Sequence, residues 1–198
     1  MVPNVVGDPP AQPGMRTPVA YLFAFFRLLT GIVFLMSAVS KLRGRAAYEE
    51  FTVATRALTR LPARPVVALV VTAEVAVAPL LAWPPTMLAG FCVALGLLVA
   101  FTVAIVVAMR RGRRVPCRCF GASAVPVGPG HLARNAVLIA AAAAGAVQAG
   151  IGAVPAWTGA VPAGLGPAGL AAVALAAGAT AVLLSAIGEI AGLFTSSP

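Results

Sequence analysis

Long apolar blocks separated by short polar segments run through most of this chain. Each block holds 19 or more residues with few charges. A helix of that length crosses the roughly 30 Å hydrocarbon core of a bilayer. The pattern predicts five membrane-spanning helices, at residues 19–40, 65–83, 86–109, 132–154 and 167–194. The predicted fold class is therefore an all-α, polytopic membrane helical bundle.

Composition supports the same class, because 61% of the residues are hydrophobic and only 10% are charged. Soluble domains average about 45–50% apolar and about 25% charged residues. The net charge of +9 comes mainly from two inter-helix segments, 41–64 with six basic residues and 110–131 with five. Basic loops face the cytoplasm in membrane proteins. We therefore expect a multi-pass protein of the cell membrane with its N-terminus outside and no nucleic-acid partner.

Proline content and block length suggest three segments. Residues 1–18 hold five prolines and are expected to form a disordered N-terminal tail. Residues 19–154 form the main transmembrane domain, and residues 155–198 form a fifth transmembrane helix with a short C-terminus. The first block is longer than the apolar region of a signal peptide and contains Arg27, so we interpret it as a true span.

Two charges lie deep inside the first two predicted spans. Arg27 lies about 12 Å from the outer end of the first span, and Glu74 about 14 Å from the outer end of the second. A charge at that depth is costly unless it is paired. The sequence therefore predicts an intramembrane ion pair between Arg27 and Glu74. A structural role for this pair is favoured over a counter-charge for a quinone or substrate pocket. Lys41 and Glu189 could pair in the same way, or could extend into the headgroups.

Two cysteines one residue apart, Cys117 and Cys119, lie in the second basic segment with Arg118 between them. A disulfide between such close neighbours is strained, which suits thiol–disulfide exchange. Nearby positive charge lowers a thiol pKa and favours the reactive thiolate. A metal site with His131 would have only three ligands and lacks the spacing of structural zinc sites. Incidental cysteines kept reduced in the cytosol stay a further alternative. Cys92, in the third span, is expected to be a packing residue.

Three polar residues open the fourth predicted span. His131, Arg134 and Asn135 stand at positions i, i+3 and i+4, which share one face of a helix. They would bring a proton carrier and two hydrogen-bond donors to the level of the cysteine loop. Interfacial anchoring is the alternative role for this polar face.

Motifs in the first, second and fourth predicted spans and in the cysteine loop form a recognisable set. Its residues are Arg27, Gly31, Phe34, Ala38, Lys41-Leu42, Glu74, Cys117-Arg118-Cys119-Phe120-Gly121 and His131-Leu132-Ala133-Arg134-Asn135. Together they resemble the methylamine utilisation protein MauE family, which lies within the wider DoxX-like group of four- or five-helix membrane proteins. The resemblance implies a DoxX-like four-helix core plus one further helix.

The resemblance also implies a role in maturation, processing or transport of the methylamine dehydrogenase small subunit, together with a thioredoxin-like partner. On this interpretation the chain is a membrane thiol–disulfide redox component. A non-catalytic assembly or export factor with incidental cysteines is the alternative, and whether the chain is an enzyme stays open. No cofactor motif is evident, although a quinone is compatible with the redox role. A transporter is disfavoured because the spans show no inverted repeat.

Overall fold

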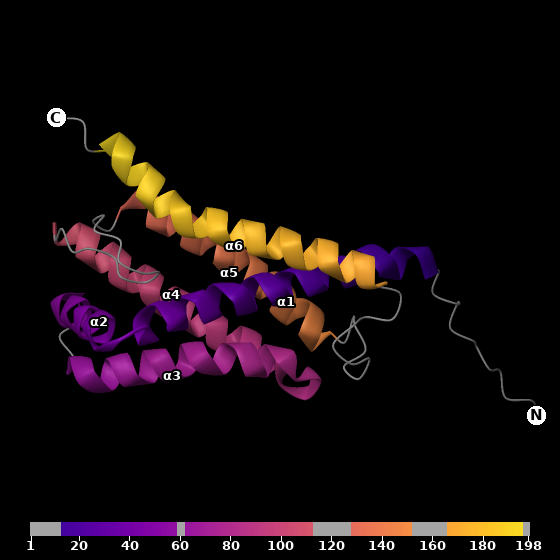
Figure 1. Cartoon of the computed structure of the whole chain (residues 1–198), viewed down its shortest axis with the longest axis horizontal. Helices are drawn as coiled ribbons and strands as arrows, with labels where there is room; N and C mark the ends of the chain where they lie inside the picture. Colours follow the sequence, from indigo (N-terminus) through magenta and orange to yellow (C-terminus); the bar gives the residue numbers. More distant parts are fainter. Residues whose placement is uncertain (1–12, 59–61, 113–127, 152–165, 196–198) are drawn as a thin grey trace, which may run out of the picture.

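A computed structural model describes residues 13–58, 62–112, 128–151 and 166–195. The described chain is helical throughout its regular elements (Figure 1). In chain order these are α1 (Pro13–Leu42), α2 (Arg45–Leu58), α3 (Ala63–Ala82), the short 3-10 turn η1 (Pro84–Thr86), α4 (Met87–Arg110), α5 (Pro129–Gly150) and α6 (Pro167–Thr195).

Five of these helices, α1 and α3 to α6, are long and apolar enough to cross a membrane, which confirms the predicted fold class. The helix ends fall within a few residues of the expected spans. The largest difference at the start of a span is in α1, which begins at Pro13, so the expected disordered tail was wrong for residues 13–18. Pro13 opens the helix, where the missing N–H of a proline would have no partner. Pro18 lies inside the helix, beyond its first turn. The expected segment boundary at residues 154 and 155 lies outside the described residues.

Four of the spanning helices form a closed ring in the order α1, α3, α4 and α5. Each packs against its two neighbours in this order, and contacts between α1 and α5 close the ring. The fifth span, α6, packs outside it against α1 and α5 (Figure 1). The arrangement is the expected four-helix core plus one helix.

The helix α2 was not predicted. Figure 1 shows it nearly end-on beside the long spans, so it lies across one end of the bundle. It packs against α1, α3 and α4. Its buried face carries Phe51, Ala54 and Thr55, and Phe51 forms a small apolar cluster with Val67 and Val71 of α3. A charged sequence can therefore form a helix here because one apolar stripe packs onto the bundle.

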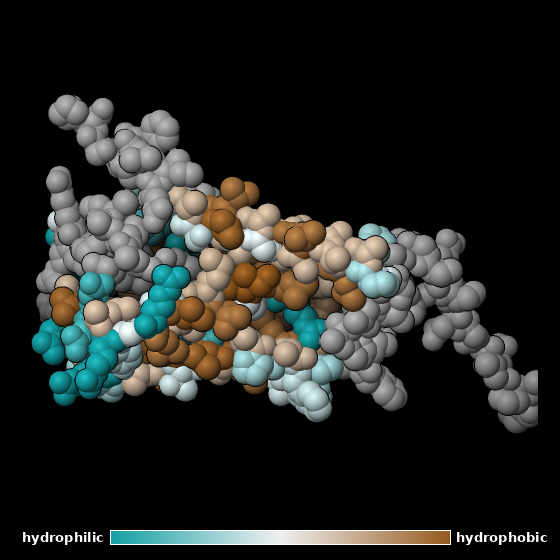
Figure 2. Space-filling view, viewed as in Figure 1, coloured by the Kyte–Doolittle hydropathy of each residue, from teal (hydrophilic) through white to brown (hydrophobic). Residues whose placement is uncertain are grey.

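The two ends of the bundle differ in polarity. The end with α2, called here the α2 end, also contains the last turn of α1, the first turn of α3, the end of α4 and the start of α5. The far end contains the opposite termini of these helices and the start of α6. Figure 2 shows hydrophilic residues gathered at the α2 end and hydrophobic residues along the middle of the bundle. This distribution is the one expected for a chain embedded in a lipid bilayer.

Close helix packing holds the ring together around α4. Phe91 of α4 is fully buried and lies against Gly145 of α5, where a Cβ atom would stand 2.4 Å from the phenyl ring. The phenyl ring of Phe91 also packs against that of Phe23 of α1, with a distance of 6.1 Å between the ring centroids. Small residues let helices approach closely in lipid, where packing rather than the hydrophobic effect drives association.

Candidate functional site

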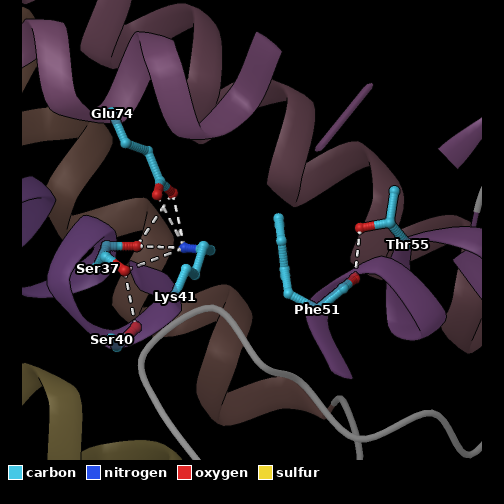
Figure 3. A network of polar contacts seen from close by, with 6 residues as sticks. All are labelled: Ser37, Ser40, Lys41, Phe51, Thr55 and Glu74. Carbon is cyan, nitrogen blue, oxygen red and sulfur yellow. Dashed lines mark hydrogen bonds and ion pairs between the residues drawn. The ribbon is translucent and has the colours of Figure 1, made fainter. Parts of the chain in front are cut away.

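The polar centre of the α2 end is a network of Lys41, Glu74 and Ser37 (Figure 3). The Lys41 Nζ atom donates to both Glu74 carboxylate oxygens, at 2.9 Å each, and to Ser37 Oγ at 2.7 Å. Ser37 Oγ in turn donates to Glu74 Oε1 at 3.0 Å. All three side chains are buried, and Glu74 has no exposed surface. The serine hydroxyl therefore closes a ring of charge-assisted hydrogen bonds between α1 and α3.

The lysine reaches this network from the last turn of α1 by pointing into the bundle. Its ammonium group also lies 4.8 Å from the centroid of the Phe51 ring of α2. A cation over an aromatic face is attracted by the ring quadrupole, more strongly where water is excluded. Phe51 thereby connects the ion pair to α2, and one buried charge holds three helices in place.

The predicted ion pair between Arg27 and Glu74 was wrong. Glu74 pairs with Lys41, and Arg27 binds backbone instead. The Arg27 Nε atom donates to the Leu81 carbonyl at 2.6 Å, and its Nη2 atom donates to the Ala82 carbonyl at 2.7 Å. These carbonyls end α3, where the helix dipole places partial negative charge. Arg27 is thus stabilised by a helix terminus rather than by a carboxylate.

The last turn of α3 explains why an arginine is needed there. A helix leaves its last four carbonyls without intrahelical partners, which is costly away from water. The Pro79 carbonyl accepts from the Trp83 backbone N–H at 3.1 Å, and the Leu80 carbonyl accepts from Thr86 Oγ1 at 2.8 Å. The two remaining carbonyls are the pair that Arg27 binds. All four terminal carbonyls of α3 therefore have donors.

The alternative partner considered for Lys41 was Glu189. The side chain of Glu189 lies outside the described residues, whereas the carboxylate bound to Lys41 is that of Glu74. The expectation that Lys41 extends into the headgroups was also wrong, because its side chain is only 2% exposed.

His131, Arg134 and Asn135 share one face of the first turns of α5, as predicted, and all three are buried. Asn135 Nδ2 donates to Thr102 Oγ1 of α4 at 3.2 Å, which links the two helices through polar side chains. His131 Nδ1 accepts from the Gly128 backbone N–H at 3.3 Å, so a neutral imidazole carries its proton on Nε2. This burial directs the polar face into the bundle, whereas an interfacial anchor would lie on its surface.

Cys117 and Cys119 lie outside the described residues. The described residues stop at Gly112, just after α4, and resume at Gly128, just before α5. Both positions are at the α2 end. Cys92 lies 18 residues before the end of α4, which is about 27 Å along the helix. It is a free thiol on an exposed face, so its expected role in packing was wrong.

Among the described residues, no group of three or more His, Cys, Asp or Glu side chains could hold a metal ion. His131 has no such companions in this part of the chain. The network of Lys41, Glu74 and Ser37 fixes α1 to α3 at the α2 end, and Arg27 fixes the same two helices at the far end.

Comparison with known families identifies the chain. The model of the methylamine utilisation protein MauE family matches residues 19–148. The chain belongs to the MauE family. The match begins in α1 and ends in α5, so it covers the four-helix ring and α2 and leaves out α6. No curated protein and no solved structure gave a significant match. The chain is thus a multi-pass membrane protein of a family involved in methylamine utilisation.

Proposed function

We propose that this MauE-family protein is a membrane thiol–disulfide redox component whose reactive groups are Cys117 and Cys119. The observation that carries the proposal is the family match over residues 19–148, which includes this cysteine pair and its basic segment. Four arginines precede the pair within eight residues, and Arg118 separates the two sulfurs. Such positive charge favours thiolates, which are the reactive form in disulfide exchange.

The proposed exchange is balanced in two steps. A thiolate of a reduced partner protein attacks one sulfur of the Cys117–Cys119 disulfide, forming a mixed disulfide and releasing the other cysteine as a thiolate. The second partner thiol then attacks the mixed disulfide. The partner leaves as a disulfide, and the cysteine pair holds the two electrons and two protons. A membrane quinone would be the two-electron acceptor that returns Cys117 and Cys119 to the disulfide.

The proposed direct partner is a thioredoxin-like protein. The methylamine dehydrogenase small subunit is the proposed protein whose disulfides are formed in the end. The proposed orientation places the cysteine pair on the cytoplasmic side, because both basic segments are at the α2 end. An enzyme matured on the other side of the membrane could not then react with the pair directly. A small redox protein is therefore the more suitable direct partner.

The decisive experiment is to trap the mixed disulfide. In the reverse of the exchange above, Cys117 is proposed to attack a partner disulfide and Cys119 to resolve the intermediate. A Cys119→Ser variant should therefore accumulate a covalent complex through Cys117 that reducing agent releases. Cys92→Ser is the matched control, because this thiol lies at the far end of the bundle. The control should leave trapping unchanged.

Serine at Cys117 or Cys119 should abolish partner maturation while the amount of inserted protein stays constant. If the double serine variant supports full maturation, the redox proposal is wrong, and the role is that of a non-catalytic assembly or export factor. That alternative depends on the bundle and not on the two thiols.

A further inference from the structure

The surface of the α2 end carries six exposed arginines. They come from the link before α2, from both ends of α2, from the start of α3 and from the end of α4: Arg43, Arg45, Arg56, Arg64, Arg110 and Arg111. The exposed acids described at this end are Glu49 and Glu50. The far end differs, because the charged side chain described there is the half-buried Arg27. Positive charge is therefore concentrated on one end of the bundle.

Within the described part of the chain, the side chains of these six arginines form no ion pair or hydrogen bond. By contrast, Lys41 and Arg27, which lie within the bundle, are satisfied by other groups of the protein. A guanidinium group offers five donors in a planar fork that matches a phosphate. The N–H donors of the exposed arginines can therefore bind a group outside the chain.

The outer face of α2 combines these charges with apolar side chains. Arg45 and Arg56 are eleven residues apart, so their side chains leave the helix axis in directions that differ by only about 20°. Val53, which is 68% exposed, lies on the same outward side. Leu42, at the end of α1, is 55% exposed. A partner in water would leave these apolar groups in contact with solvent, whereas a membrane interface receives both types of side chain.

The orientation of α2 fits the same environment. It lies across the end of the spanning helices (Figure 1), so its axis runs parallel to the surface of a membrane that these helices cross. Its buried side is fixed by Phe51, whose ring lies over the Lys41 ammonium group and packs on Val67 and Val71. The helix is therefore held at the boundary between the bundle and the headgroups with its arginines outward.

We propose that the outer face of α2, with the adjoining arginines, binds the phosphodiester headgroups of anionic phospholipids. The arginines would donate to the phosphate oxygens, while Val53 and Leu42 contact the upper acyl chains. Anionic lipid is favoured over zwitterionic lipid because the described exposed charges at this end are six positive and two negative. Each basic residue near such a surface adds to the attraction, and salt weakens it.

The test uses the full chain reconstituted in phosphatidylcholine bilayers that contain trace spin-labelled phosphatidylglycerol or phosphatidylcholine. The association of each labelled lipid with the protein is measured by electron paramagnetic resonance. The protein should prefer phosphatidylglycerol, and the preference should fall as salt rises. Arg45→Gln with Arg56→Gln should lower the preference by up to about fivefold for each arginine removed.

The matched control replaces an exposed acid on the same helix, as Glu49→Gln. This variant should raise the preference, because it removes negative charge and keeps side-chain size. Arg45, Glu49 and Arg56 are all exposed, so helix content and melting should stay the same in both variants. The proposal is overturned if the protein shows no preference. It is equally overturned if the arginine variant retains the full preference, since the lipid would then bind elsewhere.

Discussion

Breaking the buried Lys41–Glu74 pair is expected to destabilise the bundle far more than removing both charges. At 2.9 Å and an effective dielectric constant near 20, the attraction between the two charges is about 6 kcal/mol. Desolvation of two buried ions costs several kcal/mol each, so the intact pair contributes little net stability. Removal of one partner leaves the other buried and uncompensated. Lys41→Met or Glu74→Leu alone should therefore cost about 3–5 kcal/mol.

The double variant, Lys41→Met with Glu74→Leu, should recover most of this loss, because neither charge then remains in the apolar interior. The free energy of unfolding can be measured by titrating dodecyl sulfate into mixed micelles and following helix content by circular dichroism. A second double-mutant cycle, with Arg27→Met and Glu74→Leu, is the control. These effects should add, because Arg27 binds the Leu81 and Ala82 carbonyls and not Glu74. The reasoning is refuted if the Lys41–Glu74 cycle is additive, or if the Arg27–Glu74 cycle shows strong coupling.

Two other predictions concern packing and topology. Gly145→Ala should destabilise the bundle by about 1–3 kcal/mol, because its Cβ would meet the Phe91 ring at 2.4 Å. Gly178→Ala, where no atom lies within 4 Å, should be neutral or slightly stabilising in the same unfolding assay, and equal losses in the two variants would contradict the packing argument. In a background without native cysteines, Arg111→Cys should react with an impermeant maleimide only after cell lysis, whereas Gly166→Cys should react in intact cells. Labelling of both from one side would contradict the arrangement of the bundle, and labelling with the sides exchanged would reverse the proposed orientation.

Hydrophobic block length was sufficient to predict the five spans and the fold class, because burial in lipid requires long apolar helices whatever their packing partners. The helix α2 was missed because the charges of residues 41–64 dominated the interpretation of that segment. A signal for it was present in the spacing of Tyr48, Phe51 and Thr55, which recur at helical intervals on one face. An apolar stripe within a charged loop is therefore evidence for a helix at the membrane surface.

The ion pair was assigned to the wrong cation for a related reason. Depth estimates from sequence placed Arg27 and Glu74 at similar levels, but such estimates describe Cα positions and not where side chains reach. The long side chain of Lys41 extends inward from the end of α1 to Glu74. Backbone carbonyls at the end of α3 were not counted as partners for Arg27, although a helix terminus is always an acceptor. The polar face of His131, Arg134 and Asn135 was predictable because it depends only on helical periodicity.

The two charges of α1 have a consequence for biogenesis. Arg27 binds the terminal carbonyls of α3 near the far end, and Lys41 binds Glu74 of α3 near the α2 end. While α1 is alone in the membrane during synthesis, neither cation has these partners, and a lone charge in hydrocarbon is expensive. The first span thus becomes fully compatible with lipid only after the second has been translated. We therefore expect α1, α2 and α3 to reach their final positions in the membrane together, since α3 supplies the carboxylate for Lys41 and the carbonyls for Arg27.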